Sequence, residues 1–148
     1  MIDVPSDILV KLERYCAYQE RCEADVRKKM VGLAISSAQR EEIMRRLIDQ
    51  KFVDDARFAA LFVRGKMREN QWGRLKIRQG LYAKGVDSAI IDQAIADIDP
   101  EEYSNMLAEA VAKWKRLNKE DAEDRSKLIR ALLTKGFEMG EIMAFLNA

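Results

Sequence analysis

The residues best suited to chemistry in this chain are arginines and lysines clustered near its middle. Between positions 64 and 84, seven basic residues face a single acid, which gives this segment a local charge of +6. Arg64 and Arg68 are four residues apart, as are Arg74 and Arg78. Side chains at this spacing lie on one face of a helix, where two guanidinium groups can hold phosphate or carboxylate groups. The spacing therefore indicates an anion-binding face.

A binding surface predicted from these charges extends beyond the central segment. Its members are Arg27, Lys28, Arg64, Arg68, Arg74, Lys76 and Arg78. Arg27 is included because it matches Arg78 in an internal repeat, and Lys28 follows it. Residues 87–124 carry eleven acids against four basic residues, a local charge of −7, so charge is polarised along the chain although its net charge is only +1. Such polarity can steer a charged partner. The alternative interpretation is a solvated helical face, partly paired to acids such as Glu69.

The remaining candidate residues favour structural roles over catalysis. The chain contains no histidine, which removes the commonest general base and metal ligand, and it has no glycine-rich phosphate loop. Asp54 and Asp55 are adjacent and could form a metal site or an acid pair. Because they precede an apolar run of helical period, we expect them to cap a helix instead. We therefore predict no catalytic residue, no metal site and no cofactor.

Trp72 and the two cysteines each allow two interpretations. Trp72 could stack on a base or anchor a partner, but packing where two helices meet is the favoured prediction. Cys16 and Cys22 are six residues apart in a helical region and do not share a face, so we expect unpaired thiols of a cytosolic protein. The amino terminus lacks the pattern of a signal peptide, and the longest apolar run is six residues. These features predict a soluble cytoplasmic protein.

Apolar residues recur at helical spacing through the whole chain, and no segment alternates as a strand does. Ser6 is the predicted N-cap of the first helix, and Ser36 with Gln39 forms a capping-box pattern. Asp87 is a predicted cap further on. Asp99 precedes a proline and two glutamates, which together favour a new helix. The sequence therefore predicts an all-α fold.

The apolar pattern repeats every 51 residues. Val26, Ile77 and Leu128 are each 51 residues apart, and so are the residues four positions later. The third helix of the first repeat fits this register only with an insertion of three residues. A period near 50 is typical of tandem supersecondary units. We predict three tandem three-helix repeats in an elongated, curved molecule, with boundaries at 1–50, 51–99 and 100–148.

The sequence resembles the RecX family, the bacterial regulators of the RecA recombinase. The resemblance covers nearly the whole chain and is carried by four segments: Phe52-Val53-Asp54-Asp55-Ala56-Arg57-Phe58-Ala59, Trp72-Gly73, Lys84-Gly85-Val86 and Lys135-Gly136-Phe137. The segment from Glu23 to Met30 resembles the first repeat of the family. An acidic pair, an Arg-Phe-Ala and a Trp-Gly in that order exceed what helical periodicity requires.

The resemblance implies a non-enzymatic protein that lies in the groove of the RecA filament on DNA and limits filament growth and recombinase activity. It places the chain in homologous recombination, DNA repair and the SOS response. The expected partners are the RecA filament and DNA, bound through the filament or weakly alone, and we expect a monomer. Two alternatives stay open: a helical protein that binds nucleic acid independently of RecA, and a passive helical scaffold.

Overall fold

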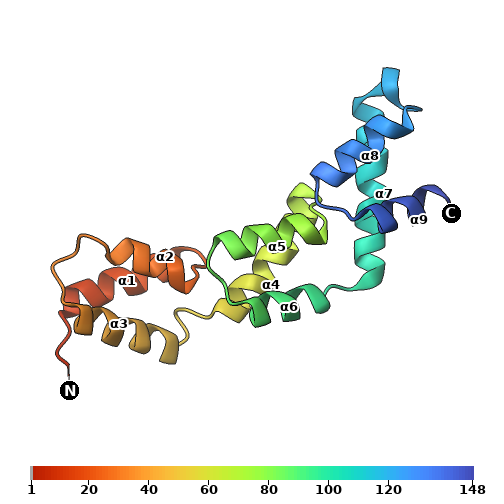
Figure 1. Cartoon of the computed structure of the whole chain (residues 1–148). Coiled ribbons are helices and arrows are strands. Elements are labelled where there is room, and N and C mark those ends of the chain that lie inside the picture. Colours follow the sequence, from red (N-terminus) through yellow and green to blue (C-terminus); the bar gives the residue numbers. More distant parts are fainter. Residues whose placement is uncertain (1) are drawn as a thin grey trace.

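The computed structural model describes residues 2–148, and over that range it contains helices and no strand. In chain order the elements are α1 (Ser6–Tyr18), α2 (Glu23–Met30), α3 (Ser37–Asp49), α4 (Asp55–Gly65), the π-helical turn η1 (Lys66–Asn70), α5 (Arg74–Ala83), α6 (Ser88–Ala96), α7 (Pro100–Leu117), the 3-10 turn η2 (Lys119–Asp121), α8 (Arg125–Thr134) and α9 (Met139–Leu146). They form three three-helix units in a row, with the termini at opposite ends of an elongated molecule (Figure 1). The predicted all-α tandem-repeat fold is confirmed, and the exact repeat boundaries stay a prediction.

Side-chain caps explain where four of these helices begin. The capping oxygens accept from first-turn N–H groups that have no partner inside the helix, and they belong to Ser36, Asp54, Asp99 and Asp124. The prediction of Ser6 as an N-cap is wrong, because Pro5 holds that position and Ser6 is the first helical residue. Asp87 occupies the predicted N-cap of α6, but its side chain makes no capping bond.

The 51-residue register holds for the second and third helices of the units, although the first helices, α1, α4 and α7, start 49 and 45 residues apart. The second helices of the three units and then the third helices start 51 residues apart, at Glu23, Arg74 and Arg125 and at Ser37, Ser88 and Met139. The expected three-residue insertion before α3 is therefore wrong. Ile43 is equivalent to Ala94 in this register, and both are buried. Because the small Ala94 occupies this core position of α6, matching the isoleucines of the two helices gave a register that was wrong by three residues.

The buried apolar side chains form two separate clusters. One belongs to the first unit and includes Leu12, Ile43 and Leu47. The other runs through both the middle and the third unit, includes Leu81 and Phe137, and also takes in Cys22 of the first unit. The middle and third units therefore share one hydrophobic core, whereas the first unit has a core of its own and contributes only Cys22 to the shared one.

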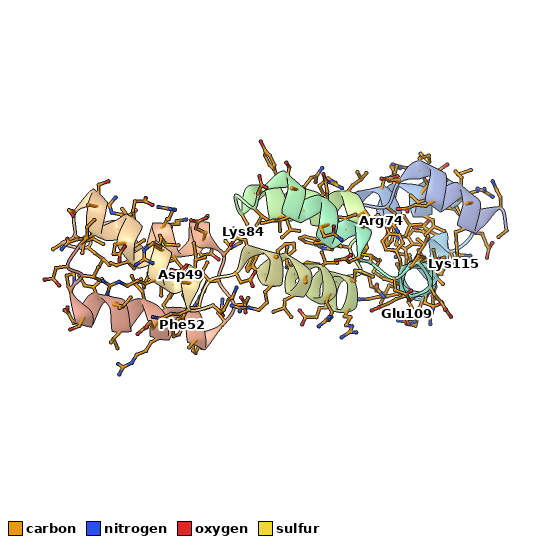
Figure 2. All side chains as sticks on the ribbon, turned by 90° about the horizontal axis from the view of Figure 1, so that it is seen from below. Asp49, Phe52, Arg74, Lys84, Glu109 and Lys115 are labelled. Atoms are coloured by element: carbon orange, nitrogen blue, oxygen red, sulfur yellow. The ribbon has the colours of Figure 1, made fainter. Side chains whose placement is uncertain are left out.

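Each of the first two units docks the amino terminus of its second helix onto the next unit. The backbone N–H of Glu23, the first residue of α2, donates to Asp55 Oδ1 at 2.8 Å. The equivalent N–H of Arg74 on α5 donates to the Tyr103 hydroxyl at 3.0 Å. Figure 2 shows Arg74 between the middle and third units and Lys84 beside the first. The next unit thus supplies the partner that a first-turn N–H lacks in its own helix.

The middle and third units also meet backbone to backbone. The N–H of Gly73 donates to the Lys135 carbonyl at 2.7 Å, and the N–H of Leu75 donates to the Gly136 carbonyl at 3.0 Å. A Cβ on Gly73 would lie 2.5 Å from backbone atoms of Gly136 and Phe137. Gly136 itself has a φ of 97°, in the left-handed region. This contact therefore requires glycine on both sides.

Two further predictions concern the cysteines and membranes. Cys16 and Cys22 are both buried and are not linked to each other, as predicted. Among residues 2–148, no helix combines the length and the apolar character needed to cross a membrane.

Candidate binding surface

Arg64 and Arg68 lie where α4 passes into η1, next to acids of the third unit. Arg68 Nε is 3.5 Å from Glu102 Oε1, and both side chains are exposed. Arg64 makes no ion pair within the described residues. Both arginines line hollows that also contain Asp99 and Glu102. The acidic segment that follows in sequence therefore folds against these arginines and reduces their net positive field.

Arg74 is held by several groups at the junction of the middle and third units. Its guanidinium lies 3.8 Å from the centre of the Tyr103 ring, and its Nη1 is 3.1 Å from Glu141 Oε2. The Tyr103 hydroxyl donates to the other Glu141 oxygen at 2.8 Å. Burial, followed by the bond to Glu141, raises the pKa of Tyr103. This arrangement makes Arg74 part of the structure between the units.

Arg27 and Arg78 make the same ion pair in successive repeats. Arg27 on α2 binds Glu41 on α3 at 2.7 Å, and it also binds Glu23 one turn earlier in its own helix. Arg78 on α5 pairs with Asp92 on α6. Both pairs join residues 14 apart, at positions that differ by 51. These arginines link the second and third helices of a unit, and the exposure of the pairs to solvent keeps their stabilising effect small.

The structure therefore divides the seven predicted binding residues into two groups. Four arginines are paired with acids: Arg27, Arg68, Arg74 and Arg78. Within residues 2–148, Lys28, Arg64 and Lys76 make no ion pair. The assumption that the basic segment lacks neutralising acids is wrong, because the acids come from other helices. The binding role of the seven residues stays a prediction.

A second basic feature lies around Trp72, on the loop between η1 and α5. Lys66 Nζ is 4.7 Å and Lys76 Nζ is 4.8 Å from the centre of the indole ring. Lys135, at the end of α8, donates from Nζ to the Asn70 carbonyl at 2.7 Å. Lys113 of α7 is included because its charge lowers the pKa of Lys135. We call these residues the Trp72 lysine cluster: Lys66, Lys76, Lys113 and Lys135.

Two members of this cluster, Lys76 and Lys113, are close enough to Lys135 for their charges to affect it. Burial lowers the pKa of Lys135, and repulsion from Lys113 and Lys76 lowers it further. Lys113 and Lys135 were absent from the predicted surface, because they lie about 40 to 60 residues beyond Lys76 in sequence. The repeat offered only a weak signal: Lys135 is equivalent to Lys84, a junction residue of the middle unit.

Trp72 is half-buried and rests on the edge of Phe62, with ring centres 6.3 Å apart. The favoured prediction of packing at a helix junction is confirmed. Gly80 leaves room beneath the ring pair, since a Cβ there would lie 2.8 Å from the Phe62 ring. Gln71, just before Trp72, has a φ of 55°, which non-glycine residues rarely adopt. The loop thus holds the tryptophan in a defined orientation.

Asp54 and Asp55, adjacent in the middle unit, serve as caps at two different helices. Asp54 accepts from the N–H of Arg57 at 3.0 Å and starts α4. Asp55 accepts from Glu23 in the first unit. Burial raises the pKa of Asp55. Within residues 2–148, no group of three or more potential ligands could hold a metal ion.

The fold and the surface together define an all-helical tandem-repeat protein with charged surfaces that extend over more than one unit. Two family models match it: the second three-helix domain of RecX over residues 54–95 and the third three-helix domain of RecX over residues 100–146. The chain belongs to the RecX family, a family of regulatory proteins.

Similar proteins and structures cover most of the chain. The "Regulatory protein RecX" of Oceanobacillus iheyensis is 28% identical over 130 residues, which are 86% of this chain and 48% of that protein. The protein of the same name from Chlorobium phaeobacteroides is 28% identical and is covered over 87% of its length, with 90% of this chain. The crystal structure of RecX from Lactobacillus salivarius gives a TM-score of 0.81 at 26% identity, with 97% of each chain covered.

A further crystal structure of a regulatory protein RecX is 30% identical, with a TM-score of 0.76 over 91% of this chain and 70% of that one. The chain spans about half the length of several of the curated relatives it matches. The shared part of these proteins therefore corresponds to the three-unit array.

Proposed function

We propose that this protein binds the RecA filament assembled on DNA and limits its assembly, its ATP hydrolysis and its recombinase activity. Membership of the RecX family supports this proposal. RecA is the partner implied by the resemblance of Phe52–Ala59 and Trp72-Gly73 to the RecX signature. The protein would act in the cytoplasm, without catalysis of its own and as a monomer.

The observation that carries the proposal is the repeated docking of the units. Equivalent positions, 51 residues apart, join each second helix to the next unit. The same position of the repeat therefore joins each unit to the next along an elongated array (Figure 1). A filament is built from identical subunits at a fixed step. An elongated array suits contact with more than one subunit of such a partner.

Titration of the protein into RecA that is hydrolysing ATP on single-stranded DNA tests the proposal. We expect the rate of hydrolysis to fall as the protein is added, because filament growth is limited. An unchanged rate at a several-fold excess of protein would contradict the proposal. Sedimentation of the filament separates filament binding from competition for free DNA. A protein that binds the filament is recovered in the pellet with RecA, whereas a protein that only competes for DNA stays in the supernatant and leaves displaced RecA there too.

The seven predicted basic residues have different expected effects in that assay. Arg64→Glu reverses a charge that makes no ion pair within residues 2–148, and it should weaken inhibition while helicity is unchanged. Arg74→Glu breaks the contact with Tyr103 and Glu141, so any loss of inhibition there should be accompanied by a lower melting temperature. Normal inhibition by the Arg64 variant would show that this side chain is merely solvated.

A further inference from the structure

The Trp72 lysine cluster differs from the four paired arginines of the predicted surface in having no acid that pairs with it within residues 2–148. Four arginines of the predicted surface are paired across helices. By contrast, none of Lys66, Lys76, Lys113 and Lys135 makes an ion pair in the part of the chain that the structure describes. The structure therefore concentrates unpaired positive charge at the junction of the middle and third units.

Elements from two units build this surface. Lys66 and Lys76 flank Trp72 in the middle unit, and Lys113 and Lys135 come from the third. The bond from Lys135 Nζ to the Asn70 carbonyl holds the two sides together next to the tryptophan loop. Since the units share a core here, the backbone positions that carry the four lysines keep a fixed arrangement. A preorganised site loses less entropy on binding than a flexible one.

The aromatic ring in the middle of these charges points to the class of ligand. Trp72 is half-buried, with Phe62 at its edge and lysine ammonium groups within 5 Å of its centre. Sites for single-stranded nucleic acid combine cationic side chains along the backbone with an aromatic ring on which a base stacks. An acidic peptide would use the lysines but would leave the ring without a planar partner.

We propose that the Trp72 lysine cluster binds a single strand of nucleic acid, with phosphates on the lysines and one base stacked on Trp72. A duplex fits less well, because its bases are already stacked on one another and do not reach a half-buried ring. Lys66 and Lys76 have flexible stems and turn from the indole to the phosphates when a base arrives. The site is independent of RecA and extends beyond the function proposed above.

Binding of a fluorescein-labelled oligothymidylate, measured by anisotropy without RecA, tests this site. Each phosphate contact on a single strand contributes about 0.7 to the slope of log K against log salt. Four lysines thus predict a slope near −3. Neutralising two of them with Lys113→Gln and Lys135→Gln should bring the slope to about −1.4, and should weaken binding at low salt.

A matched pair of substitutions controls for net charge. Lys11→Gln with Lys115→Gln removes the same charge from exposed positions outside the cluster. Lys115 is two residues from Lys113 and thus about 200° away around α7. This control variant should show the same slope of log K against log salt as the unchanged protein. Equal loss in both double variants would show that only the total charge matters, and would overturn the site.

Tryptophan fluorescence tests the stacked base without changing the cluster. The chain has two tryptophans, so Trp114→Phe leaves Trp72 as the only reporter. Oligothymidylate should quench this fluorescence with the same affinity that anisotropy gives. Unchanged fluorescence on saturation would contradict stacking, and circular dichroism checks that the variant is folded.

Two competitors distinguish the ligand class. Unlabelled single-stranded DNA should displace the probe, whereas duplex DNA and polyglutamate of equal charge should displace it at least tenfold less well. Equal displacement by polyglutamate would make the cluster a general anion site and would overturn the assignment. These outcomes do not depend on RecA, so the site and the proposed regulatory function fail separately.

Discussion

The two junctions between the units use equivalent residues but bring different groups together. At the first junction the Cys22 thiol donates to the Lys84 carbonyl over 3.6 Å. At the second, 51 residues on, the Gly73 N–H donates to the Lys135 carbonyl at 2.7 Å. Where this position is Cys22, the contact with the next unit is made through the side chain. Where it is Gly73, the two backbones are hydrogen-bonded directly.

The difference between cysteine and glycine at this position is accompanied by a difference in the hydrophobic core at the two junctions. The first junction is completed by polar contacts, including Lys84 Nζ to Asp25 Oδ1 at 3.2 Å. The second has Tyr103 and Phe137 in an edge contact, with ring centres 5.8 Å apart, inside the core that both units share. The comparison teaches that glycine at this position accompanies a fully shared core, whereas cysteine accompanies a junction at which Cys22 is the one residue of the first unit in the shared cluster.

The largest expected loss of stability comes from truncating a buried leucine in either of the two cores. Leu81→Ala and Leu47→Ala each remove a side chain that is at most 1% exposed, and each should cost ~2 to 5 kcal/mol. Only Leu81→Ala should lower the midpoint of the tryptophan-fluorescence transition in urea, because both tryptophans belong to the shared core. An unchanged midpoint for Leu81→Ala would refute its core position. An equal shift for Leu47→Ala would show that the cores are coupled.

Gly73→Ala tests the backbone contact at the second junction. The added Cβ would lie 2.5 Å from the backbone of Gly136, so the units must move apart, at an expected cost of ~1 to 3 kcal/mol. Thermal unfolding measures this loss. Gly65→Ala is the matched control, because nothing lies within 4 Å of its added Cβ, and it should leave the melting temperature equal or higher. Similar effects of the two changes would disprove close contact at Gly73.

Removing the acceptor at each junction compares the two N–H groups of α2 and α5. Tyr103→Phe leaves the Arg74 N–H without a partner and should cost ~1 to 3 kcal/mol. Asp55→Ala removes the acceptor for Glu23 and should cost ~1 kcal/mol, which chemical denaturation measures. Asp55→Asn keeps an acceptor oxygen there and should stay close to the unchanged protein. If Asp55→Asn costs as much as Asp55→Ala, the carboxylate charge rather than the cap is what matters.

The smallest expected effect is the pH dependence of the second junction. Burial and the bond to Glu141 raise the pKa of Tyr103 above its ordinary value of 10.0. The phenol is thus favoured in the folded state, so its stabilisation is complete below pH 10 and is lost as the pH rises further. The difference in alkaline absorbance between the unchanged protein and Tyr103→Phe should show that Tyr103 ionises above its ordinary pKa of 10.0. Ionisation of Tyr103 at that ordinary value in the folded protein would contradict its burial.

Local patterns were enough to predict the fold. Ser36 and Asp54 cap helices because capping depends on residues a few positions apart, and the 51-residue period was visible in Ile77 and Leu128. The inserted residues before α3 were a false prediction because Ala94 occupies a core position without the size that marks one. Periodicity detects large apolar side chains, so it misses small ones.

The binding surface was less predictable because charge pairing acts between helices. Arg74 looked free in sequence, yet Glu141 binds it from 67 residues away. Conversely, Lys113 lies in a segment of net negative charge and still belongs to the Trp72 lysine cluster. A sum of charges along the chain cannot show which side chains face one another across a junction.

The most direct test of the difference between the junctions is urea unfolding followed by two probes on one sample. Far-ultraviolet circular dichroism reports all three units, whereas tryptophan fluorescence reports only the middle and third units through Trp72 and Trp114. We expect the circular dichroism transition to be broader, with part of it at a different urea concentration, because the first unit unfolds on its own core. A single coincident transition for both probes would contradict separate cores.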